Sequence, residues 1–512
     1  MKKITKTLLI SCGIFSLCSC SNEHFLKKPD YSQYNDTMDF YAYCAANDGT
    51  LTYDGTTSVI GPSLLTKEQF QMYKDCGLNI FFPQSKAIVR EESDQFPTLR
   101  EESWEKARLV VDTAVEAGLE RTLLYDQGLS WLGLKENDTL VGEGEDYEFH
   151  SNEELDAKVL ELISLYKDYP GVYGITLADE PAYKYLKSYA EVYHSLLRIN
   201  ETLDKPLYIQ YNLNPFIMSE NVFNNFYPYV EGTDEYNFEN SFTRYKKYLN
   251  DYLDLMDPDY VQYDSYPMKA GSIGETYMPC LQYVAGVARD RGINFHNVTQ
   301  TFAMLSGLQP SYREVEEMDA RWMNNMLLSF GVDQISYFTY FTHDGGTSAG
   351  ETFVDNTAMV DNYGNKTYLY DIMKKIIGED QQFAHVYKRF DYMASDIAKK
   401  PPFDIPCAHI NNVIKDGNFT ALKEYSVDKE AALITELYDS ENDFYMYGAM
   451  NVVDPSKKGS KVFENITLKF DSKYKYALVY RNGEGKYYRL DSNSSLKIKA
   501  APGDGSFVIP FN

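Results

Sequence analysis

Two adjacent carboxylates, Asp179 and Glu180, end an apolar run and stand directly before Pro181. The run from Val172 to Leu177 is short and rich in β-branched and aromatic residues, which predicts a buried strand. Proline cannot donate to a strand ladder, so this strand should end near Asp179. Carboxylates there are costly unless they are paired or used, which indicates acid–base chemistry. An acidic helix cap is the alternative, and the tripeptide alone does not decide between the two.

Seven further apolar runs recur along the chain, and helical stretches with capping signals separate them. The eight runs begin near Asp39, Leu78, Thr122, Val172, Leu207, Tyr260, Phe295 and Gln334. Helix starts are predicted at Thr66, Ser103, Ser151 and Ser311, and helix ends at Gly77, Gly118 and Gly331. Strand and helix alternating eight times predict an α/β fold, a (β/α)8 TIM barrel. A doubly wound open sheet is the alternative, but no glycine-rich phosphate-binding turn accompanies it.

In such a barrel the reacting groups lie at the carboxyl ends of the strands. Reading only those ends gives acids, amides and tyrosines, which predict a polar, aromatic-walled pocket suited to a polyhydroxyl ligand. No histidine pairs with a carboxylate at metal-ligand spacing, so we expect neither a catalytic metal nor another cofactor. Besides Glu180, the candidate binding residues are Asp126, Asp179, Asn212, Tyr263, Asp264, Tyr266, Gln300, Tyr340 and Asp344.

The barrel should extend over residues 39–400 and end after the helix predicted at Thr367 to Ile377. Pro401 and Pro402 indicate a linker. From residue 406 to 512 the sequence changes to short alternating runs separated by turn pairs such as Asn482-Gly483. This pattern predicts a small antiparallel β-sandwich.

The first residues form a basic and then apolar leader, with an apolar core from Leu8 to Leu17. The stretch Leu17-Cys18-Ser19-Cys20 resembles a bacterial lipoprotein signal. That resemblance implies a signal peptide over residues 1–19, lipidation of Cys20, a tether over residues 20–38 and a location in the cell envelope. An ordinary secretory signal is the alternative, and the apolar run is too short for a transmembrane anchor.

Composition narrows the possible partners. The formal net charge is −26, which disfavours binding of nucleic acid or a strongly sulfated glycan. The 45 tyrosines suit stacking on flat apolar faces such as those of sugars. Beyond Cys20, the chain holds Cys44, Cys76, Cys280 and Cys407, whose spacing fits no metal cluster, so we expect buried free thiols.

The order of these elements resembles glycoside hydrolases of the large retaining (β/α)8 clan, most of all the β-galactosidase-like type with a trailing β-sandwich. Glu180 occupies the place of the clan's acid/base glutamate, although Asp179 replaces the usual preceding asparagine. The stretch 263–267 (YDSYP) resembles the D-x-Y-P stretch after strand six. The stretch 361–367 (DNYGNKT) with Tyr370, and the stretch 501–505 (APGDG) with Phe507, are similar to the last barrel helix and the last sandwich strand of that type.

One departure concerns the nucleophile, which the clan keeps at the end of strand seven. Here that end reads Asn297-Val298-Thr299-Gln300-Thr301-Phe302, without a carboxylate. The two common glycosidase mechanisms need a pair of carboxyl groups, so the second must come from another strand. Asp264 is the first choice, followed by Asp126, Asp344 and Glu351. Each of these also has a structural alternative, as a hydrogen-bond acceptor, a turn residue or a solvated loop residue.

Two functions follow from these residues. The first is a glycosidase in which Glu180 protonates the leaving oxygen, with its pKa raised by Asp179 next to it. The second is a carbohydrate-binding lipoprotein without catalysis on the same scaffold, for which the missing strand-seven acid would be the signature. A structural role for the sandwich alone leaves the polar strand ends unexplained. The sequence does not identify the sugar or the linkage.

Overall fold

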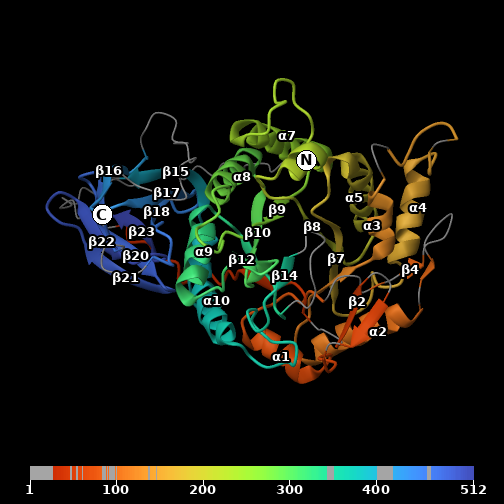
Figure 1. Ribbon diagram of the computed structural model, residues 1–512. Helices are drawn as coiled ribbons and strands as arrows, with labels where there is room; N and C mark the ends of the chain where they lie inside the picture. Colours follow the sequence, from red (N-terminus) through yellow and green to blue (C-terminus); the bar gives the residue numbers. More distant parts are fainter. Residues whose placement is uncertain are drawn as a thin grey trace, which may run out of the picture.

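The computed structural model describes residues 27–45, 49–53, 56–59, 61–83, 88, 90–91, 98–99, 101–135, 139–145, 147–342, 351–399, 419–457 and 463–512. Figure 1 shows a larger α/β domain and, beside it, a smaller domain of β-strands that ends the chain. Cys20, the leader before it, and Cys407 lie outside the described residues. No helix in the described part is both long and apolar enough to cross a membrane.

Parallel strands form the centre of the larger domain. One sheet has the order β1 (Asp39–Ala42), β13 (Gln334–Phe338), β10 (Asn294–Gln300) and β9 (Tyr260–Asp264). A second sheet has the order β6 (Thr122–Tyr125), β7 (Val172–Asp179) and β8 (Tyr208–Asn212). Single parallel bridges lie between them, from Leu213 to Tyr263, Phe81 to Thr122 and Ala45 to Pro83. The run at Leu78 thus contributes bridges rather than a longer strand, and the domain is TIM-barrel-like.

Helices surround these strands in Figure 1. Thr66 and Ser151 cap their helices as predicted, each accepting a hydrogen bond from the backbone N–H three residues on. The other two predicted starts are wrong. Ser103 lies inside α2, and Ser311 lies in the hairpin strand β12 (Gln309–Tyr312). The helices are α1 (Lys67–Asp75), α2 (Glu101–Glu116), α3 (Gln127–Gly133), α4 (Asn152–Ile163), α5 (Leu186–Asn200), α6 (Glu220–Asn225), α7 (Phe238–Met256), α8 (Tyr277–Arg291), α9 (Glu317–Ser329) and α10 (Tyr368–Tyr387).

The smaller domain consists of two antiparallel sheets, which fits the predicted β-sandwich. The six-stranded sheet has the order β15 (Asp391–Lys399), β17 (Ala431–Asp439), β18 (Phe444–Asn451), β23 (Gly505–Phe511), β20 (Tyr476–Arg481) and β21 (Glu484–Arg489). The three-stranded sheet has the order β16 (Leu422–Val427), β19 (Glu464–Phe470) and β22 (Ser495–Ala500). Since β15 pairs with β17, the sandwich already includes a strand before Pro401, earlier than the sequence indicates.

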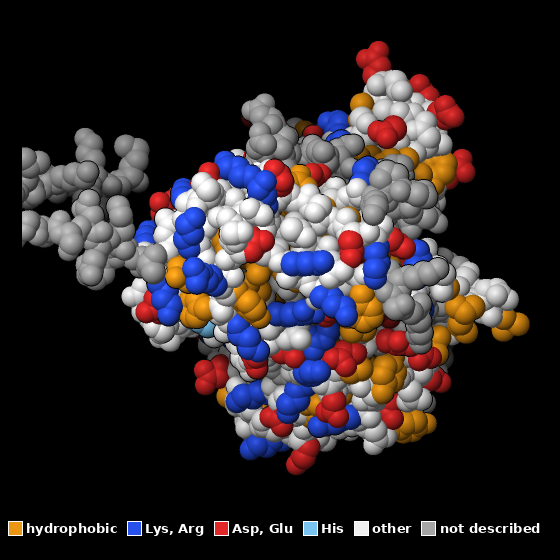
Figure 2. Space-filling view, turned by 90° about the vertical axis from the view of Figure 1, so that its left-hand side faces the viewer, with side chains coloured by type: hydrophobic (Ala, Val, Ile, Leu, Met, Phe, Trp, Pro, Cys, Tyr) orange, Lys and Arg blue, Asp and Glu red, His pale blue; other side chains and the backbone are white. Residues whose placement is uncertain are grey.

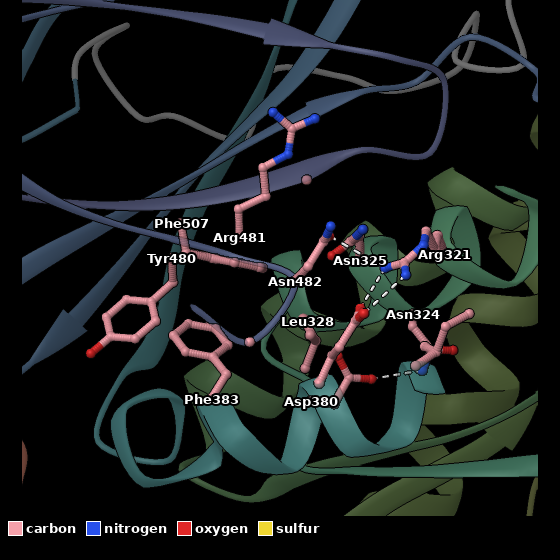
Figure 3. Close-up of a pocket in the computed structure, with 14 residues that line it drawn as sticks. Arg321, Asn324, Asn325, Leu328, Asp380, Phe383, Tyr480, Arg481, Asn482 and Phe507 are labelled. Atoms are coloured by element: carbon pink, nitrogen blue, oxygen red, sulfur yellow. Dashed lines mark hydrogen bonds and ion pairs between the residues drawn. The ribbon is translucent and has the colours of Figure 1, made fainter. Parts of the chain in front are cut away.

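Helices α9 and α10 join the two domains (Figure 3). Phe383 of α10 packs against Phe507 of β23 with ring centroids 5.1 Å apart, and Arg321 of α9 pairs with Glu379 at 2.5 Å. One hydrophobic core contains residues of both domains. Inside it lies Asp380, which accepts a hydrogen bond from Asn324 at 2.8 Å. Burial raises the pKa of Asp380 to about 7.

The segment before β1 is attached to the sandwich from Tyr31 onward. Tyr31 is buried, and its hydroxyl donates to Asp439 at 3.1 Å. Asn442 donates to the Tyr34 hydroxyl at 3.1 Å. The tether expected over residues 20–38 is therefore packed in its second half.

Candidate active site

A cleft of about 750 Å³ opens at the carboxyl ends of β7, β8 and β9. Its lining brings together five of the predicted side chains, those of Asp179, Glu180, Asn212, Asp264 and Tyr266. The strand pairing explains this meeting, because Asp179 of β7 is the register partner of Asn212 of β8. Neighbouring parallel strands carry their last side chains to the same edge of the sheet.

The backbone turns sharply at Glu180, which has a φ of 47°, in the left-handed region. Three hydrogen bonds hold the turn. The Glu180 N–H donates to the Asn212 carbonyl at 2.8 Å, and the Pro181 carbonyl accepts from the Asn214 amide at 3.1 Å and the Tyr248 hydroxyl at 2.9 Å. A non-glycine residue in this conformation costs free energy, and such positions cluster at functional sites. The turn therefore fixes the backbone position from which the Glu180 side chain extends.

Asn212 links two of the acids. Its side-chain amide donates to Asp179 Oδ1 at 3.1 Å and to Asp264 Oδ1 at 2.9 Å. The side chains of Glu180 and Tyr266 also lie close to Asp264 and oppose the rise in its pKa. Because Glu180 and Asp264 interact strongly, the two carboxyl groups titrate as a pair rather than independently.

The electrostatics of this cluster follow from three acids in one place. The negative charge of Asp264 and then burial raise the pKa of Glu180 well above its usual range, and Asp179 adds to the effect. Burial raises the pKa of Asp264, while the hydrogen bonds from Glu180, Tyr266 and Asn212 oppose that rise. Burial, followed by the charge of Asp264, raises the pKa of Asp179 to about 6. Glu180 is therefore the acid that keeps its proton at neutral pH.

The acids differ in their access to the cleft. Asp264 is only 2% exposed, whereas Asp179 and Glu180 are exposed side chains enclosed by the cleft walls. Water in the open cleft solvates Asp179 and Glu180 and weakens the rise in their pKa. A bound ligand that displaces this water would strengthen it. The arrangement presents a protonated carboxyl to a ligand above a buried, hydrogen-bonded carboxylate.

Aromatic rings form one wall of the cleft. Phe302 lies at the centre, with ring centroids 5.0 Å from Tyr266, 5.7 Å from Phe338 and 5.3 Å from Phe353. Phe353 belongs to β14 (Glu351–Phe353), which pairs with the hairpin strand β11 (Met304–Ser306). Sequence reasoning missed these phenylalanines because it looked for polar residues. Their positions just after β10 and at the end of β13 were the available signal for Phe302 and Phe338.

Two predicted binding residues, Tyr263 and Tyr340, are buried in the core away from the cleft. Tyr263 is fully buried on the other side of β9 from Asp264 and stacks on Phe295 at 5.8 Å. Tyr340 is buried against Tyr73 at 4.8 Å. Their hydroxyls are enclosed in the core, so we no longer expect them to bind substrate.

Asp126 caps helix α3. It is buried, accepting from the Gly128 N–H at 2.8 Å and the Tyr166 hydroxyl at 3.2 Å. Asp126 thus has the structural role of a turn residue, which the sequence analysis gave as the alternative to a catalytic one. Asp344 and the side chain of Glu351 lie outside the part of the chain that the structure describes.

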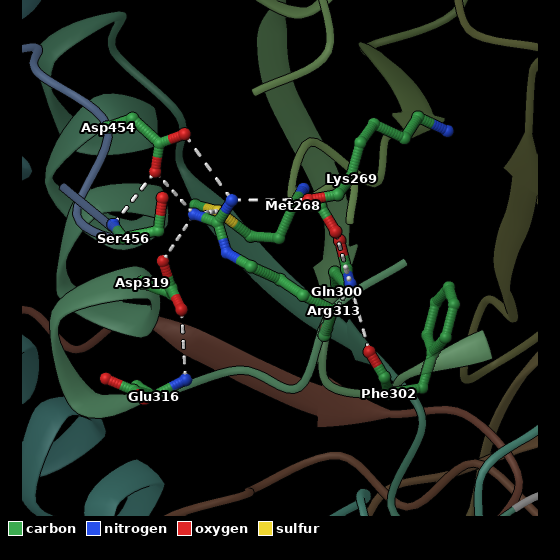
Figure 4. Close-up of polar contacts among 9 residues, drawn as sticks. All are labelled: Met268, Lys269, Gln300, Phe302, Arg313, Glu316, Asp319, Asp454 and Ser456. Carbon is green, nitrogen blue, oxygen red and sulfur yellow. Dashed lines mark hydrogen bonds and ion pairs between the residues drawn. The ribbon is translucent and has the colours of Figure 1, made fainter. Parts of the chain in front are cut away.

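Gln300, at the end of the seventh strand, is turned into the protein (Figure 4). It is completely buried, its Oε1 accepts from the Met268 N–H at 2.9 Å, and its Nε2 donates to the Phe302 carbonyl at 2.9 Å. Arg313 nearby pairs with Asp319 at 2.7 Å and Asp454 at 2.8 Å. Gln300 therefore supports the loop that carries Phe302 and does not reach the cleft. In the described ranges, no group of three or more His, Cys, Asp or Glu side chains could hold a metal ion.

Comparisons with known proteins give structural likeness only. No family model matches the sequence, and no curated protein matches it. A glycoside hydrolase family 5 structure from Bacteroides vulgatus is similar at 10% identity and a TM-score of 0.48, over 87% of this chain and 85% of that one. The GH39 enzyme from Xanthomonas axonopodis pv. citri is similar at 10% identity and a TM-score of 0.37, over 94% and 99% of the two chains. A β-galactosidase from Halorubrum lacusprofundi is similar at 12% identity and a TM-score of 0.38, over 67% and 58%. These values are too low to indicate which reaction this chain performs.

Proposed function

We propose that the protein is a glycoside hydrolase acting on an oligo- or polysaccharide, with Glu180 as general acid and Asp264 as the second carboxylate. The observation that carries the proposal is the pair of interacting carboxyl groups, Glu180 and Asp264, that line one cleft. A general acid must hold its proton at the working pH and be fixed within reach of the leaving oxygen. The raised pKa of Glu180 and its held backbone turn meet both needs.

The spacing of the two carboxyl groups would decide whether the anomeric configuration is retained or inverted. Inversion needs carboxyl groups about 6.5 to 9.5 Å apart to admit a water, and retention needs about 5 to 5.5 Å. In a retaining mechanism, the glycosidic oxygen of the substrate would bind next to Glu180. Glu180 would then donate its proton to that oxygen, and Asp264 would attack the anomeric carbon. Asn212 would help to keep Asp264 ionised by donating a hydrogen bond to it.

The rest of the cleft supports a sugar ligand. Asp179 keeps an exposed carboxylate that can accept from sugar hydroxyls, and the wall of Tyr266, Phe302 and Phe353 offers apolar faces for sugar rings. The bridges at Phe81, Ala45 and Leu213 support a closed eight-stranded barrel as the frame. The leader and Cys20 support export and lipid anchoring in the cell envelope, with the membrane as partner through that lipid.

A carbohydrate-binding protein without turnover is the second candidate, favoured by the buried Gln300 where the resembled clan keeps its nucleophile. A screen of aryl glycosides and oligosaccharides separates the two. We expect the wild type to turn over at least one glycoside and Asp264→Asn to bind the sugar without turnover. Asp126→Asn is the matched control, because asparagine also caps a helix and Asp126 lies outside the cleft. Sugar binding by the wild type with no turnover of any glycoside would favour the second candidate.

A further inference from the structure

The negative charge of the chain is unevenly distributed. Residues 419–512, which form most of the sandwich, hold thirteen Lys and Arg and thirteen Asp and Glu, so their formal charge is zero while the whole chain carries −26. Figure 2 looks onto the side of the molecule that carries the sandwich and shows Lys and Arg side chains gathered on it. The net charge of the whole chain disfavours anionic partners, but this argument does not apply to the face formed by the sandwich.

A groove of about 540 Å³ lies on this domain, between the last strands of its two sheets. One side is β21, the edge strand of the six-stranded sheet, and the other is β22, the edge strand of the three-stranded sheet. All six residues of β21 are exposed. Alternation along that strand turns Lys486 and Tyr488 to the same side, and both line the groove.

The cations of the groove are not equally engaged. Arg481 pairs with Asp504, and Lys486 pairs with Glu484 at 2.8 Å. Lys497 and Lys499 of β22 are exposed, and neither pairs with a carboxylate of the described residues. The Lys499 ammonium lies over the Phe463 ring, 5.2 Å from its centroid. Two residues apart on one strand, they stand roughly 7 Å from each other. Tyr488 lines the same groove and is 45% exposed, so the groove also offers an aromatic ring.

We propose that this groove binds a segment of an acidic polysaccharide, separately from the cleft in the barrel. Lys497 and Lys499 would pair with carboxylate or sulfate groups along the glycan, and Tyr488 would stack on a sugar ring. A lysine on an edge strand can also serve only to prevent strand pairing between molecules. That role needs neither an aromatic partner nor a groove, and this site has both.

Binding of acidic polysaccharides to the full chain tests the proposal. The probes are polygalacturonate, which carries carboxylates, and chondroitin sulfate, which carries sulfates, with dextran as the neutral comparison and anionic lipid vesicles as a separate arm. The groove variant is Lys497→Gln/Lys499→Gln. The control is Lys423→Gln/Lys473→Gln, which removes the same charge from the same domain at residues that do not line the groove.

We expect one of the two acidic polymers to bind and dextran not to bind. The groove variant should lose about tenfold or more in affinity, since each charge-assisted hydrogen bond typically contributes more than a neutral one. Tyr488→Ala should also weaken binding, and the control should not. Binding that falls equally in both double variants, binding only to vesicles, or no binding of either acidic polymer would overturn the proposal.

Discussion

The charge of Asp264 raises the pKa of Glu180, and Asn212 connects Asp264 to Asp179, so the three acids depend on one another. Three charges in one place repel strongly, and the cluster relieves this by keeping a proton on Glu180. The chemistry of the site therefore belongs to the cluster and not to a single residue. A change in one acid should be seen in the titration of another.

Replacing Asp179 by asparagine tests this coupling. Asp179 raises the pKa of Glu180 through its charge, so Asp179→Asn should lower that pKa. In the wild type, kcat/KM should fall at high pH as Glu180 loses its proton. In Asp179→Asn, Glu180 would lose that proton at a lower pH, so we expect this fall in activity to begin at a lower pH. Asp126→Asn, at a strand end outside the cleft, should leave the pH of this fall unchanged. A fall that begins at the same or a higher pH in Asp179→Asn would contradict the coupling.

Gln300→Glu tests whether the end of the seventh strand can regain a nucleophile. The Gln300 amide donates to backbone carbonyls, which a carboxylate cannot do, and the site is completely buried. We expect a loss of about 2 to 4 kcal/mol in unfolding free energy, measured with urea, and no gain in turnover. Gln309→Glu, in an exposed strand, should cost little. A stable variant with higher turnover would show that Gln300 can face the substrate.

Strand alternation decides which predicted residues reach the cleft. In β9, Asp264 lies on the cleft side, and Tyr263 beside it points toward the helices. The period of two was visible in the sequence and could have excluded Tyr263. The left-handed turn at Glu180 could not be foreseen, because it depends on contacts with β8 and α7. Nor could the meeting of Phe353 with Phe302, since their strands are distant in the chain.

Helix α10 carries a buried acid that should make stability depend on pH. The pKa of Asp380 is raised by burial to about 7, so the folded protein keeps this proton between roughly pH 4 and 7 while the unfolded chain releases it. Its contribution to stability is thus greatest at low pH and falls as pH rises toward 7. The loss is a few kcal/mol, at about 1.4 kcal/mol per pKa unit.

Asp380→Asn should remove this part of the pH dependence. The urea midpoints of the variant and the wild type are measured at pH 5 and pH 8. We expect the difference, variant minus wild type, to be more positive at pH 8 than at pH 5. The control is Asp371→Asn on the exposed side of the same helix, which should follow the wild type. Parallel curves for Asp380→Asn and the wild type would contradict the buried role.

On the scale of the whole molecule, the two kinds of domain could be predicted from the sequence, but the hydrophobic core that they share could not. Each sandwich strand after residue 430 corresponds to one of the short runs in the sequence, and β19 shows the alternating burial of a half-buried strand. The shared core, with β15 crossing into the sandwich sheet, depends on contacts between distant segments. The packing of the segment at Tyr31 on the sandwich also depends on a contact between distant segments and could not be predicted.

The lipid anchor is a prediction that belongs to the whole molecule. The basic and apolar leader before Cys20 should direct lipidation in a bacterial host. We expect radiolabelled fatty acid to enter the wild-type protein, and Cys20→Ala to abolish the labelling. Cys18→Ala is the matched control and should be labelled normally. Labelling that persists in Cys20→Ala would show that the leader is an ordinary secretory signal or that another residue carries the lipid.

The most direct test of the central claim compares Glu180→Gln with the wild type on two glycosides of the same sugar, one with an activated phenol and one with a poor leaving group. Glutamine keeps the shape and removes the proton. We expect a loss of about 10²- to 10⁴-fold in kcat/KM on the poor leaving group and a much smaller loss on the activated one, which needs little protonation. Glu275→Gln, in the same cleft, should change neither rate much. An equal loss on both substrates, together with a lower melting temperature, would contradict Glu180 as the general acid.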